Sequence, residues 1–407
     1  MDTPHQEHDI LLINDYVARV MQVRARTTAS DMLLIEDRAL LQRHESTHLM
    51  TFMGTLKQGD SAQHYRTLDD TLMPLDAYAL FREGDATAPH VIHVLKHRPA
   101  PAGKPNVWLP LVLFVATVLS VMFTGMTIAV GEIALTDLPQ ALALAQEPLA
   151  NLWRGLPYAL SIMLILGAHE LGHYVMMRRY GVASSLPYFI PAFAVSPFGT
   201  FGATIALKET LGSRKMLFDV GVSGPLAGLV FAVAILLYGL ATSQVIPMSD
   251  GGWVEGNSAL YALAKLLVFG QFLPNGEVDV LVNQYAWAGW TGLFVTALNL
   301  IPLGQLDGGH VLYAFMGSWA RKLYTPFLLM MAFFVLFVST AWLILVLLLA
   351  LLGRFYALPL DDITPLDPFR QRVAFAVFVL FGLIFVPSPL SQTGVMGGLL
   401  GLLLSAA

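Results

Sequence analysis

The sequence contains no cysteine. Disulfide bonds and thiolate metal ligands are therefore excluded, and any bound metal must rely on histidine, aspartate or glutamate. Charged residues are also scarce: they make up 13% of the 407 residues, whereas about 25% is usual in soluble proteins. Hydrophobic residues account for 56%, and the mean hydropathy is positive. This composition predicts a multi-pass α-helical membrane protein with a smaller polar part.

Basic residues are not in excess, since the formal net charge is −5. The sequence therefore gives no sign of nucleic-acid binding, and we expect no nucleic-acid partner. Residues 1–10 are acidic and polar. They resemble neither the apolar core of a signal peptide nor an Arg/Ser-rich transit peptide, which favours a bacterial protein over a plastid one.

The polar part is at the N-terminus, where residues 1–105 contain only short apolar runs. We predict a small soluble α+β domain here, followed by a membrane-embedded domain at 106–407. The pattern indicates helices at 10–22 and 61–73 and strands at 48–56, 78–82 and 90–95. Prolines and glycine between residues 100 and 105 predict the linker between the two domains.

The most informative stretch is an H-E-x-x-H motif at His169, Glu170 and His173, inside a strongly apolar run. On a helix, residues i and i+4 lie on one face, so both imidazoles can bind one zinc ion and leave a position open for water. Glu170 lies beside that face and can act as the general base. The motif also arises by chance, but ionisable residues inside a membrane helix are costly and usually functional.

A second H-E-x-x-H motif occurs in the N-terminal domain, at His44, Glu45 and His48. Its downstream flank, with Thr51 and Phe52, favours a strand over a helix. No apolar stripe surrounds it, and no second helix supplies a further carboxylate. We therefore predict the end of a solvated helix leading into a strand, and no zinc site.

Apolar runs predict six to eight membrane segments. These lie at 107–130, 157–177, 218–240, 286–303, 326–352, 373–386 and 394–404, and the 326–352 run is expected to form two short helices that turn near Ser339 and Thr340. Arg178 and Arg179 follow the second segment, so the positive-inside rule places that end in the cytoplasm. The N-terminal domain and the opening of the metal site are then cytoplasmic as well.

The third segment begins with small residues, Gly221, Ser223, Gly224 and Gly228 among them. Small side chains allow helices to approach closely in a membrane. Helix packing alone is the expected role of these residues.

The segment 181–214 is not a simple membrane span. It contains Pro187, Pro191, Pro197, Gly199 and Gly202, with phenylalanines between them. Non-helical backbone at membrane depth has to be sheltered by protein or line a cavity. Residues 200–207 have the composition of a strand, which favours an edge strand beside the metal to which an extended peptide can add. An ordinary interfacial loop is the alternative.

A carboxylate for the metal site is found near the end of the fourth segment. That helix crosses inward, so Asp307 arrives at the depth of His169 and His173, and Pro302 and nearby glycines break the helix there. Two histidines, one carboxylate and a water form a catalytic zinc set. The alternative for Asp307 is a helix cap at the interface.

Taken together, the His169–His173 motif, the stretch from Asn299 to Pro302 and the stretch from Leu306 to His310 resemble the site-2 protease family of intramembrane zinc metalloproteases. Residues 197–203 and 219–225 look like the branch without a PDZ domain that is found in chloroplasts and cyanobacteria. Residues 54–57 read Gly-Thr-Leu-Lys, whereas that branch carries Gly-Asn-Leu-Arg. The resemblance covers roughly residues 107–390.

By this resemblance, one Zn²⁺ per chain would be bound by His169, His173 and Asp307, with Glu170 as the base. A re-entrant β-hairpin-like loop would present an edge strand to substrate, and Asn299 would hold the substrate or its oxyanion. The implied substrate-binding residues of the loop are Phe198, Gly199, Thr200, Phe201, Gly202 and Ala203.

The implied function is cleavage of transmembrane helices in other membrane proteins, as in regulated intramembrane proteolysis. Its partners would be a transmembrane protein substrate, the lipid bilayer and a regulator bound by the N-terminal domain, in a bacterial cytoplasmic membrane. Two alternatives stay open. One is a metal transporter that uses the same ligands as a transit site, and the other is a catalytically silent membrane scaffold.

Overall fold

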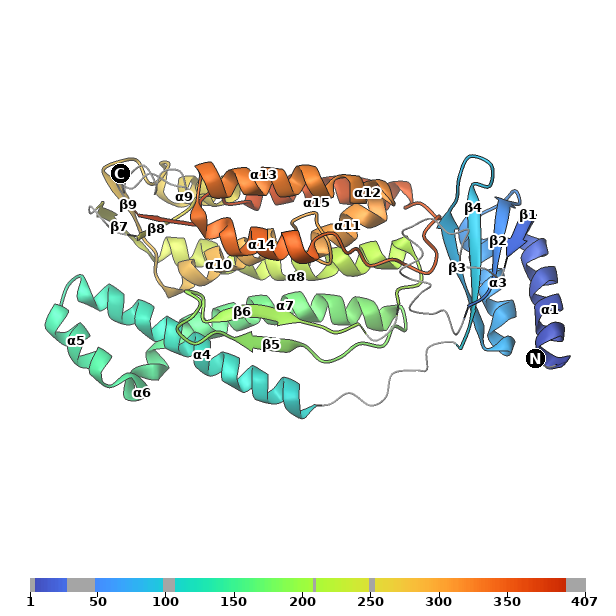
Figure 1. Ribbon diagram of the computed structural model, residues 1–407. Coiled ribbons are helices and arrows are strands. Elements are labelled where there is room, and N and C mark those ends of the chain that lie inside the picture. Colours follow the sequence, from blue (N-terminus) through green and yellow to red (C-terminus); the bar gives the residue numbers. More distant parts are fainter. Residues whose placement is uncertain (1–3, 28–47, 98–106, 208–209, 249–252, 393–407) are drawn as a thin grey trace. The chain divides into compact units, whose positions relative to one another are not determined.

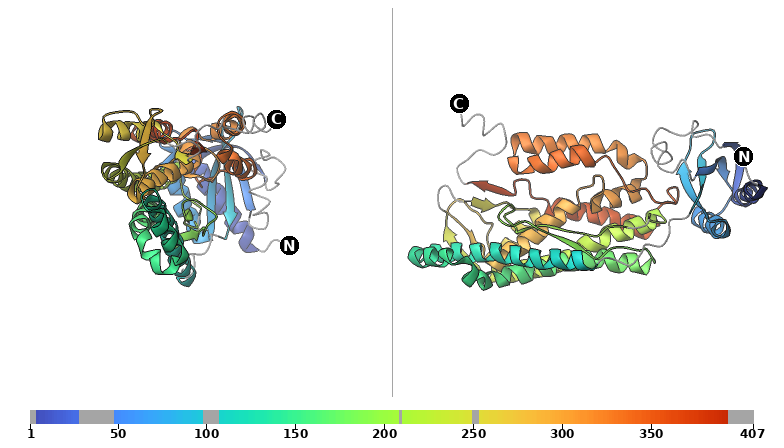
Figure 2. Two further views of the ribbon diagram at one scale, coloured as in Figure 1. Left: turned by 90° about the vertical axis from the view of Figure 1, so that its left-hand side faces the viewer. Right: turned by 60° about the horizontal axis from the view of Figure 1, so that its bottom comes forward.

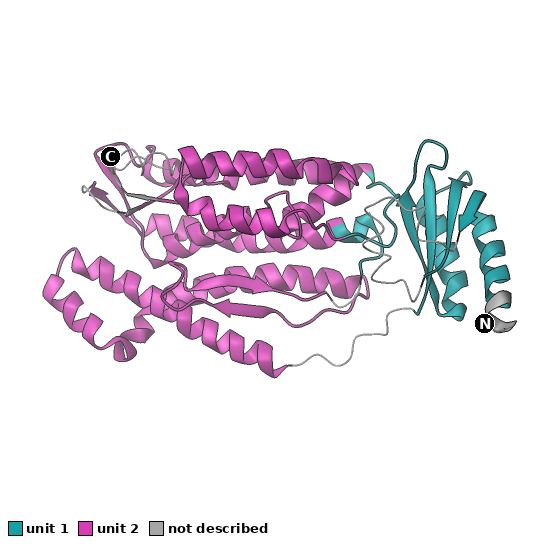
Figure 3. Ribbon diagram, in the orientation of Figure 1, with its two compact units in different colours: residues 1–103, 209–217, 358–367 teal, residues 104–208, 218–357, 368–407 magenta. Residues whose placement is uncertain are grey.

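A computed structural model of the chain describes residues 4–27, 48–97, 107–207, 210–248 and 253–392 (Figure 1). The chain divides into two compact units (Figure 3). Unit 1 contains Met1–Gly103, Glu209–Leu217 and Leu358–Asp367, and unit 2 contains Lys104–Lys208, Phe218–Ala357 and Pro368–Ala407. The predicted linker at 100–105, residues 44–47 of the second histidine motif and the predicted helix at 394–404 lie outside the described residues.

Unit 1 is built on a four-stranded antiparallel sheet with the strand order β1-β2-β4-β3. The strands are β1 (Met21–Thr27), β2 (His48–Leu56), β3 (Ala77–Glu83) and β4 (His90–Lys96), and the helices are α1 (Pro4–Val20), α3 (Ser61–Leu72) and the 3₁₀ turn η2 (Met73–Leu75). The predicted strands at 48–56, 78–82 and 90–95 are β2, β3 and β4, and the predicted helix at 61–73 is α3. Strand β1 follows α1 directly, where the predicted helix at 10–22 runs two residues too far.

The core of unit 1 lies between the sheet and its two helices. Side chains alternate along a strand, so Ala77, Ala79 and Phe81 of β3 share one face. Ile13 and Val17 of α1 join the same buried cluster, as do Leu68 and Leu72 of α3, so both helices cover this face (Figure 2). On the opposite face, a smaller cluster contains Tyr78, Leu80 and Leu95.

Two short segments from distant parts of the chain extend the sheet of unit 1. Residues 360–362 pair in parallel with β3 at Phe81, and Ser213 pairs in parallel with Asp361 on the far side. Two buried arginines hold these segments. Arg82 donates to the carbonyl of Pro359 at 2.9 Å, and Arg214 donates to the carboxylate of Asp362 at 3.1 Å. The compact unit therefore includes more of the chain than the N-terminal stretch to residue 105.

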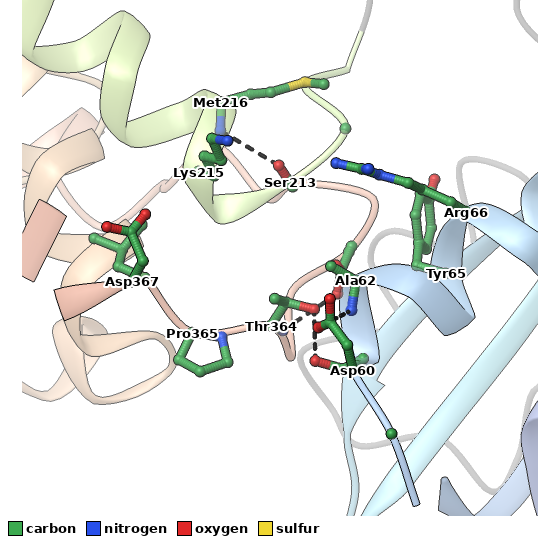
Figure 4. Close-up of a pocket in the computed structure, with 15 residues that line it drawn as sticks. Asp60, Ala62, Tyr65, Arg66, Ser213, Lys215, Met216, Thr364, Pro365 and Asp367 are labelled. Atoms are coloured by element: carbon green, nitrogen blue, oxygen red, sulfur yellow. Dashed lines mark hydrogen bonds between the residues drawn. The ribbon is translucent and has the colours of Figure 1, made fainter. Parts of the chain in front are cut away.

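Unit 1 also contains a cavity of about 580 Å³ (Figure 4). It is lined where the start of α3 meets the two added segments: by Gly59, Asp60, Ser61, Ala62, Tyr65, Arg66, Gly212, Ser213, Lys215, Met216, Asp361, Thr364, Pro365, Leu366 and Asp367. Within this wall, the hydroxyl of Thr364 donates to that of Ser61 at 2.9 Å. None of the lining residues belongs to the H-E-x-x-H motif in the apolar part of the chain.

Unit 2 is mostly helical. Its longer helices are α4 (Trp108–Ala134), α7 (Leu156–Arg179), α8 (Arg214–Ala241, which begins in unit 1), α9 (Ala259–Phe269), α10 (Gln284–Asn299), α11 (Asp307–Met316), α13 (Tyr324–Phe337), α14 (Leu343–Leu352) and α15 (Pro368–Ile384). Shorter pieces are α5 (Leu138–Gln146), α6 (Pro148–Asn151), η3 (Leu152–Gly155), α12 (Trp319–Lys322) and η4 (Thr340–Trp342). Three small two-stranded sheets complete it. They pair β5 (Tyr188–Pro191) with β6 (Thr200–Thr204), β7 (Gln244–Pro247) with β9 (Val278–Leu281), and β8 (Trp253–Glu255) with β10 (Leu390–Gln392).

Among the described residues, four helical stretches are long and apolar enough to cross a membrane: Trp108–Ala134, Pro148–Arg179, Arg214–Ala241 and Trp319–Phe337. The first three match the spans predicted at 107–130, 157–177 and 218–240. The predicted run at 326–352 forms the two helices α13 and α14, which meet at Ser339 as expected. The Ser339 hydroxyl accepts the N–H of Ala341 and so caps the following turn.

The fourth predicted segment, 286–303, is longer than the helix that forms there. Helix α10 ends at Asn299, and the chain turns before α11 starts at Asp307. Pro302 lacks a backbone N–H, and Gly304 adopts a left-handed conformation with φ of +59°, so neither residue continues a helix. This turn places Asp307 in the first turn of a helix, where the helix dipole favours a negative charge.

Candidate metal centre

Helix α7 presents both histidines of the motif on one face. Leu156–Arg179 is an uninterrupted helix, so His169 and His173 lie one turn apart with their rings stacked edge to face. The exposed fractions of His169, Glu170 and His173 are 5%, 4% and 8%. Three ionisable side chains are thus withdrawn from solvent in an apolar helix, which is costly unless they share a charged partner.

Asp307 meets these histidines as the sequence predicts. Its Oδ2 lies 3.3 Å from Nε2 of His169 and 3.3 Å from Nε2 of His173. The two Nε2 atoms are 3.1 Å apart. Among the described residues this is the one group of His, Asp and Glu side chains whose atoms can hold a metal ion. The helix-cap alternative for Asp307 does not account for its place between the two imidazoles.

The three ligand atoms fit a tetrahedral metal ion. Metal–ligand distances of about 2.0–2.1 Å place neighbouring ligands about 3.3 Å apart in a tetrahedron. The separations in the structure, 3.1 to 3.3 Å, match that edge length. Nδ1 of His173 donates to the carbonyl oxygen of Val220 at 2.8 Å, so in the neutral ring Nε2 carries the lone pair. The donor set is therefore arranged for a cation.

The turn between α10 and α11 brings the carboxylate into place through close backbone contacts. A Cβ at Gly308 would lie 2.0 Å from the carbonyl oxygen of Leu300, and one at Gly309 would lie 2.3 Å from that of Gly304. Only glycine fits at both positions. The Gly308–Gly309 pair next to Asp307 is therefore required for the turn that aims the carboxylate at α7.

Two further polar side chains lie at the centre. Nδ2 of Asn299, the last residue of α10, is 3.4 Å from Nε2 of His169. Glu170 interacts electrostatically with His169, His173 and Asp307, which places its carboxylate near all three. The centre thus combines three ligand atoms, one carboxylate outside the ligand set and one amide.

Helix α8 lies directly against His169 and His173, whereas the sequence predicts only general helix packing for its small residues. A Cβ at Gly224 would lie 2.1 Å from Nε2 of His173, and one at Gly228 would lie 3.1 Å from Cβ of His169. Conversely, a Cβ at Gly172 of α7 would lie 2.4 Å from the carbonyl oxygen of Ser223. The small residues do serve helix packing, and what they pack against is the pair of candidate ligands, His169 and His173. The glycine inside the motif, Gly172, is the sequence feature that indicates a close helix contact at this point.

The loop after α7 forms an antiparallel hairpin of β5 (Tyr188–Pro191) and β6 (Thr200–Thr204), with Phe189 opposite Ala203. The ordinary-loop alternative is therefore wrong for this segment. Strand β5 lies along α4, and β6 lies on the side of α7 (Figure 1). Phe201 is 64% exposed, whereas Thr200 is buried. The outer edge of β6 has no strand partner among the described residues.

Three helices hold the tip of the hairpin. The Ser120 hydroxyl of α4 donates to the carbonyl of Gly199 at 2.6 Å and accepts the N–H of Ala192 at 3.3 Å. The Tyr158 hydroxyl of α7 donates to the carbonyl of Phe198 at 3.0 Å. The ring of Phe198 packs 5.7 to 6.3 Å from three rings of α10, those of Trp287, Trp290 and Phe294. The hairpin is therefore fixed to the same helices that carry His169 and Asn299.

Of the second histidine motif, only His48 lies among the described residues. His48 lies in strand β2, as the flank of the motif predicts, and its Nε2 is 2.9 Å from the Thr51 hydroxyl. Burial lowers the pKa of His48, with a smaller contribution from His93. A neutral histidine in a hydrogen-bonded strand accounts for this position.

Comparison with known proteins gives a consistent result. Residues 157–343 match the family model described as Peptidase family M50. The chain is 32% identical over 256 residues to the "Probable zinc metalloprotease EGY2, chloroplastic" of Arabidopsis thaliana, covering 61% of this chain and 44% of that protein. It is 28% identical over 298 residues to the "Probable zinc metalloprotease EGY1, chloroplastic" of Oryza sativa subsp. japonica, covering 66% and 50%. The chain thus spans half or less of the length of these relatives.

Proposed function

Because residues 157–343 carry a Peptidase family M50 (site-2 protease) domain, we propose that this protein is an intramembrane zinc metalloprotease that cleaves transmembrane helices of other membrane proteins. The observation that carries the proposal is the triangle of ligand atoms from His169, His173 and Asp307, with sides of 3.1 to 3.3 Å. These residues would hold one Zn²⁺. The names of the relatives, zinc metalloproteases, support the choice of metal and of reaction.

Each residue of the centre has a chemical role in this proposal. When bound, zinc supplies Lewis acidity that activates a water molecule near neutral pH and polarises a carbonyl. Glu170 accepts the proton of the attacking water and delivers it to the leaving amine. Asn299 donates from Nδ2 toward the substrate carbonyl, where negative charge develops. His173 keeps its Nδ1 proton on the Val220 carbonyl throughout.

A helical substrate hides its carbonyl groups in its own hydrogen bonds, so it must become extended before it can be cleaved. Unpaired backbone groups cost several kcal/mol each in a bilayer. We propose that the segment to be cut pairs with the edge of β6, which replaces part of the lost helical bonding. The hairpin residues would then contact substrate; they are Phe198, Gly199, Thr200, Phe201, Gly202 and Ala203.

The anchor of the hairpin provides a test of this role. We expect Ser120→Ala to lower kcat/KM for cleavage about tenfold, since losing a buried hydrogen bond costs about 1–3 kcal/mol and 1.4 kcal/mol corresponds to a factor of ten. Zinc content should not change, because among the described residues the Ser120 hydroxyl bonds only the hairpin segment. The measurement is steady-state cleavage of one transmembrane peptide together with metal analysis of the same preparations.

Thr127→Ala is the matched control on the same helix, because the Thr127 hydroxyl bonds only the carbonyl of Thr124. We expect Thr127→Ala to cleave like the wild type. Equal activity of Ser120→Ala and Thr127→Ala would show that the hairpin anchor plays no part in substrate engagement.

We further propose that the chain is an integral membrane protein with six to eight membrane segments. Arg178 and Arg179 at the end of α7 support a cytoplasmic location for that end. The soluble domain and the opening of the centre would then face the cytoplasm. The relatives are named chloroplastic, whereas we predict a bacterial cytoplasmic membrane for this chain. A regulator bound by the soluble domain stays a prediction.

Reconstitution distinguishes proteolysis from the transport alternative. The purified full chain is placed in proteoliposomes with single-span peptides that carry a tag at each end, and zinc-sensitive dye is enclosed in parallel vesicles. We expect fragments whose new ends lie inside the apolar sequence, loss of cleavage with a zinc chelator, and recovery after zinc is added back. Zinc flux into the vesicles without any peptide fragment would instead support the transporter and overturn the proposal.

A further inference from the structure

The Val220 carbonyl is the group that orients the imidazole of His173. Its oxygen accepts two hydrogen bonds, one from Nδ1 of His173 at 2.8 Å and one from the Ser223 hydroxyl at 2.8 Å. Groups that bond the far nitrogen of a metal-bound histidine fix its tautomer and ring direction, and their loss commonly costs 10- to 100-fold in metal affinity. Because Val220 acts through its backbone, its position depends on how α8 is held.

Helix α8 contains an internal proline close to Val220. Pro225 lies inside the helix, lacks an N–H and leaves the carbonyl of Gly221 without its usual helical donor. Such a position bends a helix and opens its hydrogen-bond ladder to other donors. Gly224 lets this opened turn lie directly against the ring of His173. The turn therefore lacks one helical hydrogen bond, a loss that support from outside the helix can offset.

That support is a cluster centred on Asp219, the residue before Val220. Arg370, near the start of α15, donates from Nε to Oδ1 at 2.8 Å and from Nη2 to Oδ2 at 2.7 Å. The Tyr180 hydroxyl, just after α7, also donates to Oδ2. The side chains of Arg370 and Asp219 are 21% and 13% exposed, so water screens the pair only in part. One carboxylate thus ties together α8, α15 and the end of α7.

Two parallel hydrogen bonds between a guanidinium and a carboxylate fix orientation as well as distance. A single contact would fix the distance between the two groups but not the orientation of the Asp219 carboxylate, whereas the paired contact fixes both. Rotation of α8 at Asp219 would carry the neighbouring carbonyl of Val220 away from Nδ1 of His173. The cluster is therefore suited to setting the direction of a metal ligand that it does not touch.

We propose that Asp219, Arg370 and Tyr180 form a positioning cluster that holds the Val220 carbonyl on His173 and so sets the zinc affinity of the centre. This inference rests on the proposed zinc site but not on the identity of the substrate. It assigns a role to three residues outside the ligand set, on elements that approach one another only in the folded chain.

The test measures zinc affinity of the purified full chain in detergent, by competition with a chromogenic chelator. We expect Asp219→Asn and Arg370→Met to weaken zinc binding about tenfold or more. Arg370→Lys keeps the charge but loses the paired contact, and should fall between Arg370→Met and the wild type. Arg372→Met is the matched control, because Arg372 is exposed on the same helix and, within the part of the chain that the structure describes, its side chain donates only to the carbonyl of Pro368.

A spectroscopic readout separates positioning from general loss of structure. In protein loaded with Co²⁺, the visible bands report the geometry around the metal, and we expect them to shift in Asp219→Asn and Arg370→Met but not in Arg372→Met. The double variant should lose no more affinity than the single variants, since both remove one unit. If Arg370→Met does not fold, the folded Arg370→Lys protein carries the same comparison.

Wild-type affinity and an unchanged cobalt spectrum in both Asp219→Asn and Arg370→Lys would overturn the positioning role. The outcome is distinguishable from failure of the proposed function: there, the wild-type chain itself would bind no zinc, or would bind zinc without cleaving any peptide. If the wild type and the variants bind zinc equally tightly, the positioning role of the cluster is refuted and the proposed function is not.

Discussion

Glu170→Gln is expected to abolish peptide cleavage while the protein keeps its zinc. The substitution preserves the shape of the side chain but removes the carboxylate that accepts the proton of the attacking water. General-base catalysis contributes about 10²- to 10⁴-fold, so the rate should fall by at least that range. Zinc should stay bound, because His169, His173 and Asp307 are unchanged and their ligand atoms already define the site.

The measurement pairs a cleavage assay in proteoliposomes with zinc analysis of the same protein. Glu147→Gln is the control, since Glu147 is exposed in the loop between α5 and α6 and should leave the rate unchanged. Cleavage by Glu170→Gln at the wild-type rate would remove Glu170 from the mechanism. Loss of zinc from this variant would instead make Glu170 part of the ligand set.

Gly224→Ala is expected to have the second large effect, a loss of zinc affinity of about 100-fold or more. The added Cβ would lie 2.1 Å from Nε2 of His173 and 2.5 Å from two of its ring carbons. The ring cannot simply swing aside, because its Nδ1 is bonded to Val220 on the same helix. Either α8 moves away from α7 together with the Val220 carbonyl, or the His173 side chain moves away from the metal site. In both cases the expected loss of zinc affinity is larger than the 10- to 100-fold loss that follows removal of one supporting contact.

Gly382→Ala is the matched control for this substitution. It adds the same methyl group to a helix of unit 2, α15, where the new Cβ would meet no atom within 4 Å. Zinc titration should show that Gly224→Ala binds zinc about 100-fold or more weakly than Gly382→Ala. Equal zinc affinity of Gly224→Ala and Gly382→Ala would mean that α8 does not lie against His173 in the protein.

The meeting of His169, His173 and Asp307 could be predicted from sequence because its geometry is nearly local. His169 and His173 need only a helix to share a face, and Asp307 needs only a span that runs in the opposite direction and a break at its end. Pro302 and the glycines mark that break in the sequence. Hydropathy likewise predicts α4, α7 and α8, since each is a long uninterrupted apolar run.

The support around the ligands could not be predicted, because it depends on how separate helices meet. Asp219 and Arg370 are 151 residues apart, and nothing in either neighbourhood marks the pair. The acceptor for His173 is a backbone carbonyl, which no residue type reveals. Gly224 is read from sequence as a packing residue, and only the fold shows that it lies against His173, a candidate metal ligand.

Unit 1 shows the same limit. Strands β2, β3 and β4 lie where the sequence predicts strands, but the segments Glu209–Leu217 and Leu358–Asp367 also belong to this unit. They are short, and their pairing with Phe81 and with each other is made through backbone. Hydropathy divides the chain near residue 105 and gives no indication that these two later segments belong to unit 1.

X-ray absorption at the zinc edge of the purified protein tests the central claim most directly. The account predicts one zinc per chain, with nitrogen and oxygen ligands at about 2.0–2.1 Å and the scattering of two imidazole rings, both lost when His169 and His173 are replaced by alanine. Zinc surrounded by three or more imidazoles, or zinc that remains bound after both histidines are removed, would contradict it.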